Sequence, residues 1–104
     1  MLYVLKYVPG PNWQPEKPVT EQPLEDHLAY MARQFERGAL LMGGPLMDHS
    51  GGLIILHVAD LQEAQQIMAA DPAVTSGIVA GSAHPWMPLM KRTCFCDAPP
   101  GSPS

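Results

Sequence analysis

A histidine and an aspartate, His27 and Asp71, are the residues of this chain best suited to chemistry. A carboxylate hydrogen-bonded to an imidazole fixes the tautomer of the ring and stabilises the charge that the ring gains with a proton. Such a pair can act as a general base that takes a proton from a bound molecule. The same pair also occurs as a plain buried hydrogen bond between helix ends, so both interpretations stay open here.

The segment that carries His27 predicts a helix from Gln22 to Gly38. Its apolar stripe has helical spacing and consists of Leu24, Leu28, Met31 and Phe35. His27 lies three residues after Leu24 and four before Met31, so we expect it at the edge of this stripe, turned toward the interior. Pro23 suits the first turn of such a helix, because its missing N–H costs nothing there.

Asp71 follows a second predicted helix. Asp60, with Glu63 three residues later, is a capping-box pattern, and the amphipathic run after it ends at Asp71 and Pro72. A residue before proline avoids the helical conformation, so the helix must stop there. Asp71 continues the inward face of this helix, four residues after Ile67. We therefore expect both the imidazole and the carboxylate to face the sheet.

Four apolar segments predict strands at residues 2–8, 39–45, 53–58 and 78–86. With the two helices, the order is strand, helix, strand, strand, helix, strand, which predicts an α+β, ferredoxin-like (βαββαβ) fold with a four-stranded antiparallel sheet and two helices on one face. In this topology the start of the first helix lies beside the end of the second, which brings His27 and Asp71 together. Residues 2–8, apart from Lys6, and 53–58 are apolar on both faces, so we expect both strands to be central and covered on both sides. A second subunit packed sheet against sheet would give a dimeric α+β barrel.

Four further residues are candidates for substrate binding: Tyr3, Trp13, Asp48 and Trp86. Trp13 stands in a proline-rich loop at residues 9–20, and loops of this length in small domains are often functional. The loop is a lid over a pocket, or Trp13 packs against its own subunit or a neighbour. Asp48 follows a Gly-Gly-Pro strand end, where it shapes a turn or lines a pocket rim.

Composition excludes several classes of function. Six Lys and Arg against ten Asp and Glu leave a net charge of −4 without a basic cluster, so we expect no nucleic-acid partner. No apolar run has the length of a membrane span, and the first residues are typical of a strand rather than a secretory leader, so we expect a cytoplasmic protein without a membrane partner. Cys94 and Cys96 could supply half a metal site at most, and we expect no metal and no cofactor. Residues 1–92 should form the domain, and 93–104 a flexible tail.

The chain also resembles the YCII-related domain family. The resemblance rests on the opening strand Met1–Val4, His27 in the first helix, residues 38–45, the Ala70-Asp71-Pro72 turn and Pro85-Trp86. No single motif is specific, but their order and spacing together are, and they cover the chain except residues 9–18 and those beyond Arg92. The resemblance implies a fold similar to that of muconolactone isomerases. It also implies an enzymatic role for the histidine and aspartate that match His27 and Asp71, and the family includes a dehydrochlorinase branch.

We therefore expect a small enzyme, without a cofactor, that transfers a proton on a small organic substrate, with cyclic and aromatic molecules as the first candidates. Elimination or isomerisation, the work of a lyase or an isomerase, fits a histidine base. Two alternatives remain. One is a non-catalytic dimer in which His27 and Asp71 only orient a bound small molecule. The other is an accessory domain that docks on a larger enzyme. The expected partners are a second copy of the chain and a small-molecule ligand.

Overall fold

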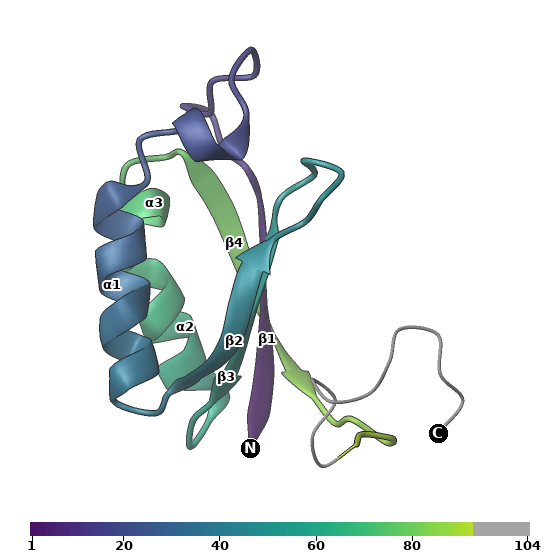
Figure 1. Cartoon of the computed structure of the whole chain (residues 1–104). Helices are drawn as coiled ribbons and strands as arrows, with labels where there is room; N and C mark the ends of the chain where they lie inside the picture. Colours follow the sequence, from purple (N-terminus) through teal and green to yellow (C-terminus); the bar gives the residue numbers. More distant parts are fainter. Residues whose placement is uncertain (93–104) are drawn as a thin grey trace.

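An antiparallel sheet of four strands with helices on one face makes up the structure of this chain (Figure 1). The computed structural model describes residues 1–92 of the 104. The strands are β1 (Leu2–Pro9), β2 (Leu40–Pro45), β3 (Gly52–His57) and β4 (Val79–Trp86), and the two main helices are α1 (Glu25–Glu36) and α2 (Leu61–Ala69). With the strand order β2-β3-β1-β4, this is the predicted ferredoxin-like α+β arrangement.

The central strand β1 alternates between the two faces of the sheet. Tyr3, Leu5 and Tyr7 point to the helical side and are at most 5% exposed, whereas Lys6 and Val8 point to the other side and are exposed. Leu56 of β3 is fully buried on the helical side as well. The helix α2 packs against β1 and β4, and α1 packs against β2, so the core lies between sheet and helices.

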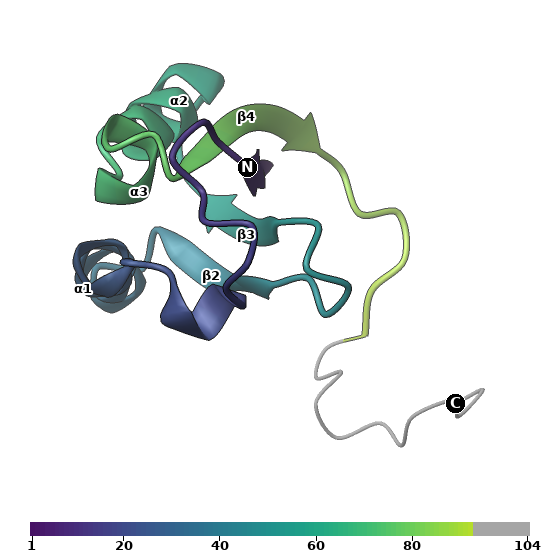
Figure 2. The same cartoon turned by 90° about the horizontal axis from the view of Figure 1, so that it is seen from above.

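The face of the sheet opposite the helices carries no helix in the described part of the chain (Figure 2). Val8 is 48% exposed and Leu53 is 38% exposed on this face. The sequence predicted that the first and third strands are central, which the strand order confirms, and that they are covered on both sides. Within residues 1–92 the helices cover one side only, so the prediction of a covering second subunit remains a prediction.

Two features of α1 differ from the expectation. The helix begins at Glu25 rather than at Gln22, so that Pro23 precedes it. The predicted inward stripe is also wrong in part, because Leu28 is 65% and Phe35 is 60% exposed, while Gln34 is buried. The stripe therefore does not face the core along its whole length, and the surface that it lines instead is described with the site below.

The capping of α2 agrees with the sequence, but the segment after it does not. The Glu63 backbone N–H donates to the Asp60 carboxylate at 2.8 Å, and the Glu63 carboxylate accepts from the Ala59 N–H at 3.1 Å. Beyond α2, the sequence predicted only a turn before the last strand. The structure has a further single-turn helix there, α3 (Pro72–Thr75), whose N-cap is Asp71.

Within residues 1–92, no helix is both long and apolar enough to cross a bilayer. Cys94, Cys96 and the predicted flexible tail at residues 93–104 lie outside the described residues.

Candidate functional site

Asp71 stands at the start of α3 because its own sequence context caps that helix. Pro72 occupies the first helical position, where no N–H is needed, and the Ala73 N–H donates to Oδ1 of Asp71 at 2.9 Å. The side chain of Asp71 is 0% exposed, although a carboxylate is rarely buried without partners. Its burial is therefore tolerated only because its oxygens accept several hydrogen bonds.

His27 on the first turn of α1 provides the second of these bonds. Its Nδ1 lies 2.9 Å from Oδ1 and 2.8 Å from Oδ2 of Asp71. The contact between the start of α1 and the segment after α2, predicted from topology, is confirmed. The side chain of His27 is 16% exposed, so the imidazole has the buried carboxylate on one side and reaches accessible space on the other.

Tyr7 of β1 provides the third bond, and the sequence interpretation missed it. Its hydroxyl donates to Oδ2 of Asp71 at 2.8 Å, and its ring packs edge-on to the His27 ring at a centroid distance of 6.0 Å. Burial, and next the negative charge of Asp71, raise the pKa of the Tyr7 hydroxyl far above its ordinary value. Tyr7 therefore stays protonated and acts as a donor. Gly81 of β4 leaves room for it, because a Cβ there would lie 2.7 Å from the Tyr7 ring.

The hydrogen bonds that Asp71 accepts from Tyr7 and Ala73 decide which nitrogen of the His27 ring is free. Because the carboxylate accepts from Tyr7 and from the Ala73 N–H, it is the acceptor toward His27 as well, and Nδ1 carries the hydrogen. The other ring nitrogen, Nε2, has no hydrogen-bond partner in the described part of the chain, and it is not among the buried atoms. It therefore presents a lone pair to the space in front of the ring.

His27 also forms part of the wall of a cavity of about 640 Å³. The cavity lies between α1 and the β2–β3 hairpin and reaches the Trp13 loop. Its other wall residues are mostly apolar or glycine, with Glu25 and Glu36 as the charged side chains among them. Asp71 lies behind His27 and Tyr7 rather than on the cavity wall. A ligand would therefore meet the imidazole and not the carboxylate.

The loop before α1 closes one end of this cavity, with Trp13 on the wall. Gln22, which is 4% exposed, holds the loop: its amide oxygen accepts from the Gln14 N–H at 3.0 Å, and its amide nitrogen donates to the carbonyls of Gln14 at 2.7 Å and Lys17 at 2.9 Å. The Asn12 side chain ties the same loop to the end of α3 through the Ser76 carbonyl, at 2.7 Å. Trp13 packs against the core of its own subunit and forms part of the cavity wall.

The structure does not bring the other three predicted binding residues to this cavity. Tyr3 lies four residues before Tyr7 on β1, about 13 Å away along the strand, and its hydroxyl donates a hydrogen bond to the Met1 sulfur, at 3.5 Å. Trp86 pairs with Leu2 at that same far end of the sheet. These placements follow from topology: the end of β1, not its start, leads toward α1, so Tyr7 rather than Tyr3 lies at the level of His27.

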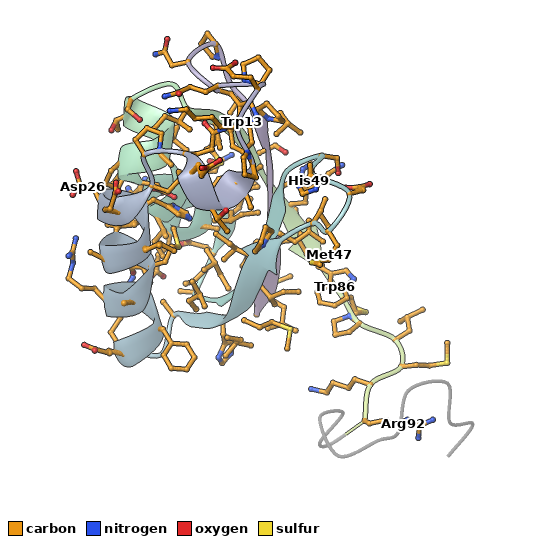
Figure 3. The ribbon with its side chains drawn as sticks, turned by 45° about the horizontal axis from the view of Figure 1, so that its top comes forward. Trp13, Asp26, Met47, His49, Trp86 and Arg92 are labelled. Atoms are coloured by element: carbon orange, nitrogen blue, oxygen red, sulfur yellow. The ribbon has the colours of Figure 1, made fainter. Side chains whose placement is uncertain are left out.

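Asp48 occupies the tip of the β2–β3 hairpin between Met47 and His49, which project away from the helices (Figure 3). Asp48 is fully exposed and accepts hydrogen bonds from the hydroxyl and then the backbone N–H of Ser50, which lower the pKa of its carboxyl. His49 beside it has a positive φ of 65°. For Asp48 the sequence predicted either a turn residue or part of a pocket rim, and the geometry supports the turn.

Gln22 is the other residue that the sequence interpretation missed. A glutamine before a helix has no pattern that separates a buried clamp from a solvent-exposed side chain. Tyr7, in contrast, could have been found, because it shares a face with Leu5 and stands at the end of β1 that leads to α1. Among residues 1–92, no group of three or more His, Cys, Asp or Glu side chains is arranged to hold a metal ion.

Fold and site together define a small α+β domain in which a histidine, held by a buried aspartate, faces a cavity. The sequence profile of the YCII-related domain matches residues 1–83, and the chain belongs to this family. No protein of curated function matches the chain significantly.

One solved structure of similar fold is the 5-chloro-2-hydroxyhydroquinone dehydrochlorinase from Burkholderia phenoliruptrix AC1100, in complex with 2,5-dihydroxybenzoquinone. The alignment covers 84% of this chain and 94% of that chain, with 17% sequence identity and a TM-score of 0.60. At this identity the likeness establishes the fold and not the substrate.

Proposed function

We propose that this protein is a small enzyme in which Nε2 of His27 removes a proton from a small organic molecule bound in the cavity. The observation that carries the proposal is the pairing of two features at one imidazole. Nδ1 is fixed by a buried carboxylate at 2.8 and 2.9 Å, and the opposite nitrogen is accessible at the wall of a largely apolar cavity. A general base needs both an oriented ring and a free lone pair within reach of the substrate.

The proposed reaction begins when a C–H or O–H group of the substrate lies against Nε2. The base takes the proton, and the electron pair left behind forms a new double bond. In an elimination, a leaving group then departs with its own electron pair; in an isomerisation, the imidazolium returns the proton to another atom. Asp71 stabilises the imidazolium through Nδ1–H, while the Tyr7 hydroxyl and the Ala73 N–H keep the carboxylate an acceptor.

The comparisons support this proposal at a coarser level. A protein of the same fold is a dehydrochlorinase, and its structure holds a single-ring hydroxylated quinone. Hydroxylated and halogenated ring compounds are therefore the first substrates to test for this chain.

The experiment measures proton abstraction directly, since the substrate is not known in advance. A panel of hydroxylated, halogenated single-ring compounds and cyclic enols is incubated with the protein in D₂O, and ¹H NMR follows the loss of carbon-bound hydrogens and the appearance of products. We expect at least one compound to exchange or to react. The variant His27→Asn should lower that rate by about 100-fold or more, because its amide can still donate to Asp71 but the Nε2 base is gone.

The matched control is His49→Asn, which changes another histidine at an exposed hairpin position where asparagine tolerates the positive φ. Its rate should equal that of the wild type. A panel compound that binds the wild-type protein without exchange or reaction would support the non-catalytic alternative. A rate that survives His27→Asn would rule out His27 as the base.

A further inference from the structure

The cavity extends well beyond the reach of one ring placed at His27. It continues along the length of α1 to Phe35 and Glu36, eight and nine residues after the histidine, and on to Leu40 of β2. Eight helical residues span about 12 Å. An apolar cavity of about 150 Å³ is enough to hold benzene, so a single ring would leave most of the 640 Å³ empty.

The part of the cavity beyond His27 is apolar on both sides. On the α1 side its wall contains Leu28, Met31 and Phe35, three members of the apolar stripe that the sequence predicted for the core, together with Ala32, and it ends at Glu36. The outer members of this stripe, Leu28 and Phe35, are the ones left exposed. On the sheet side, Gly43 and Gly44 of β2 contribute only backbone to the wall, so between Leu40 and Pro45 no β2 side chain is part of it.

Apart from Glu36, which lies at the far end, the polar and charged residues of the cavity wall lie at the end near His27. His27, Gln22 and Thr20 lie there beside Trp13, whereas the stretch between Leu28 and Phe35 contains only apolar side chains on α1. A molecule that matches this distribution has a polar, reactive ring at one end and an extended hydrocarbon group at the other. Exposed apolar surface of this kind, continuous with a polar subsite, is typical of a ligand site.

We infer that the ligand of this site is amphiphilic: a hydroxylated ring that reaches His27 and carries an apolar chain or second ring, which lies along α1 between the Leu28–Phe35 stripe and the glycines of β2. The inference rests on the proposed function for the placement of the ring at His27. The apolar chain is argued from the shape and lining of the cavity alone.

The test uses 4-methylphenol, 4-butylphenol and 4-hexylphenol as probes, with dissociation constants measured by calorimetry on the full-length protein. Each methylene that enters an apolar site improves binding by about fourfold, so the hexyl compound, with five methylenes more, should bind about 1,000-fold more tightly than the methyl compound. The variant Ala32→Phe places a ring on the wall beside Leu28 and Phe35. It should remove most of this gain in affinity and change the dissociation constant of the methyl compound by less than about twofold.

Ala29→Phe is the matched control, because Ala29 is exposed on the same helix but is not part of the cavity wall, and it should leave all three constants unchanged. Phe35→Ala removes a side chain from the same part of the wall, and it should weaken the binding of the hexyl compound more than that of the methyl compound. Dissociation constants that do not fall with chain length, including no binding of the hexyl compound, would overturn the inference. So would a chain-length gain that both Ala32→Phe and Phe35→Ala leave intact.

Deuterium exchange in the same series separates this inference from the proposed function. Length-dependent binding without exchange on any probe would count against catalysis and leave the ligand class standing. Deuterium exchange on the methyl compound alone would support His27 as a general base and contradict the inference that the substrate is amphiphilic.

Discussion

Asp71 accepts three hydrogen bonds and His27 gives only one of them, so the two residues should contribute unequally to stability. Removal of the imidazole leaves the carboxylate with the Tyr7 hydroxyl and the Ala73 N–H. Removal of the carboxylate leaves three donors without their acceptor, and each buried unsatisfied group costs about 1–3 kcal/mol.

The first prediction therefore contrasts two alanine variants by thermal and denaturant unfolding. His27→Ala should leave the melting temperature nearly unchanged while it abolishes turnover or ligand binding. Asp71→Ala should lower the free energy of unfolding by about 3–5 kcal/mol. If His27→Ala were the more destabilising variant and left ligand affinity intact, the pair would be a plain structural bond between helix ends.

The second prediction concerns pH and follows from the raised pKa of Tyr7. In the unfolded chain the phenol ionises near its ordinary value of 10.0, while in the folded protein it keeps its proton to higher pH. Stability from this group is therefore fully present below pH 10 and is lost as pH rises above it. The slope is up to about 1.4 kcal/mol per pH unit for one proton.

Urea unfolding of the wild type and Tyr7→Phe between pH 8 and about 11 measures this effect. At pH 8 the variant should be less stable by about 1.5–3 kcal/mol, since it lacks a hydrogen bond to a carboxylate. Its alkaline loss of stability should be shallower than that of the wild type. Parallel curves would mean that Tyr7 titrates alike in the folded and unfolded states. Tyr3→Phe, which alters a tyrosine at the far end of β1, is the control.

At the scale of elements, the loop that carries Trp13 keeps its shape through the side chain of Gln22. The third prediction is that Gln22→Ala releases this loop: it removes the hydrogen bonds from Gln22 to the Gln14 N–H and to the Gln14 and Lys17 carbonyls, and it should cost about 2 kcal/mol of unfolding free energy. Ligand affinity should fall with it, because the loop closes one end of the cavity. Amide hydrogen exchange of residues 12–18 should accelerate. Unchanged exchange there would show that other contacts hold the loop.

The helix α1 illustrates what periodicity can and cannot predict. Its 3.6-residue pattern identified an apolar stripe correctly, but a pattern does not say whether the surface opposite is core or cavity. Here the cavity wall on β2 includes Gly43 and Gly44, which contribute only backbone, and Leu28 and Phe35 stay exposed. The short helix α3 was missed for a related reason: four residues are too few for a periodic signal, although Asp71-Pro72 is a capping sequence.

At the scale of the whole molecule, the order of elements was sufficient to predict both the fold and the meeting of His27 with Asp71. The four strands and the two main helices each had an apolar pattern, and the topology that joins them allows few arrangements. The residues of the cavity wall were harder to predict because they depend on which end of a strand faces the cavity. Tyr3 and Trp86 lie at the wrong end of their strands, and Tyr7 at the right one.

The fourth prediction is that the protein is a dimer, with the open face of the sheet covered by a second copy. Val8 and Leu53 are exposed on this face, and a domain of this size gains stability from burying it. Light scattering at micromolar concentration should give twice the mass of the chain, and Ile55→Lys, a charge in the middle of β3 on that face, should give the monomer. A monomeric wild type would contradict the prediction.

The central claim, that Asp71 holds His27 with Nε2 free to accept a proton, is tested most directly by ¹⁵N NMR of the histidine side chains. At a pH where the ring is neutral, we predict that His27 is the Nδ1–H tautomer, with a non-protonated Nε2 whose chemical shift moves when a phenol is added. A neutral His27 with its hydrogen on Nε2 would contradict the account, because that nitrogen would then have no lone pair to serve as a base.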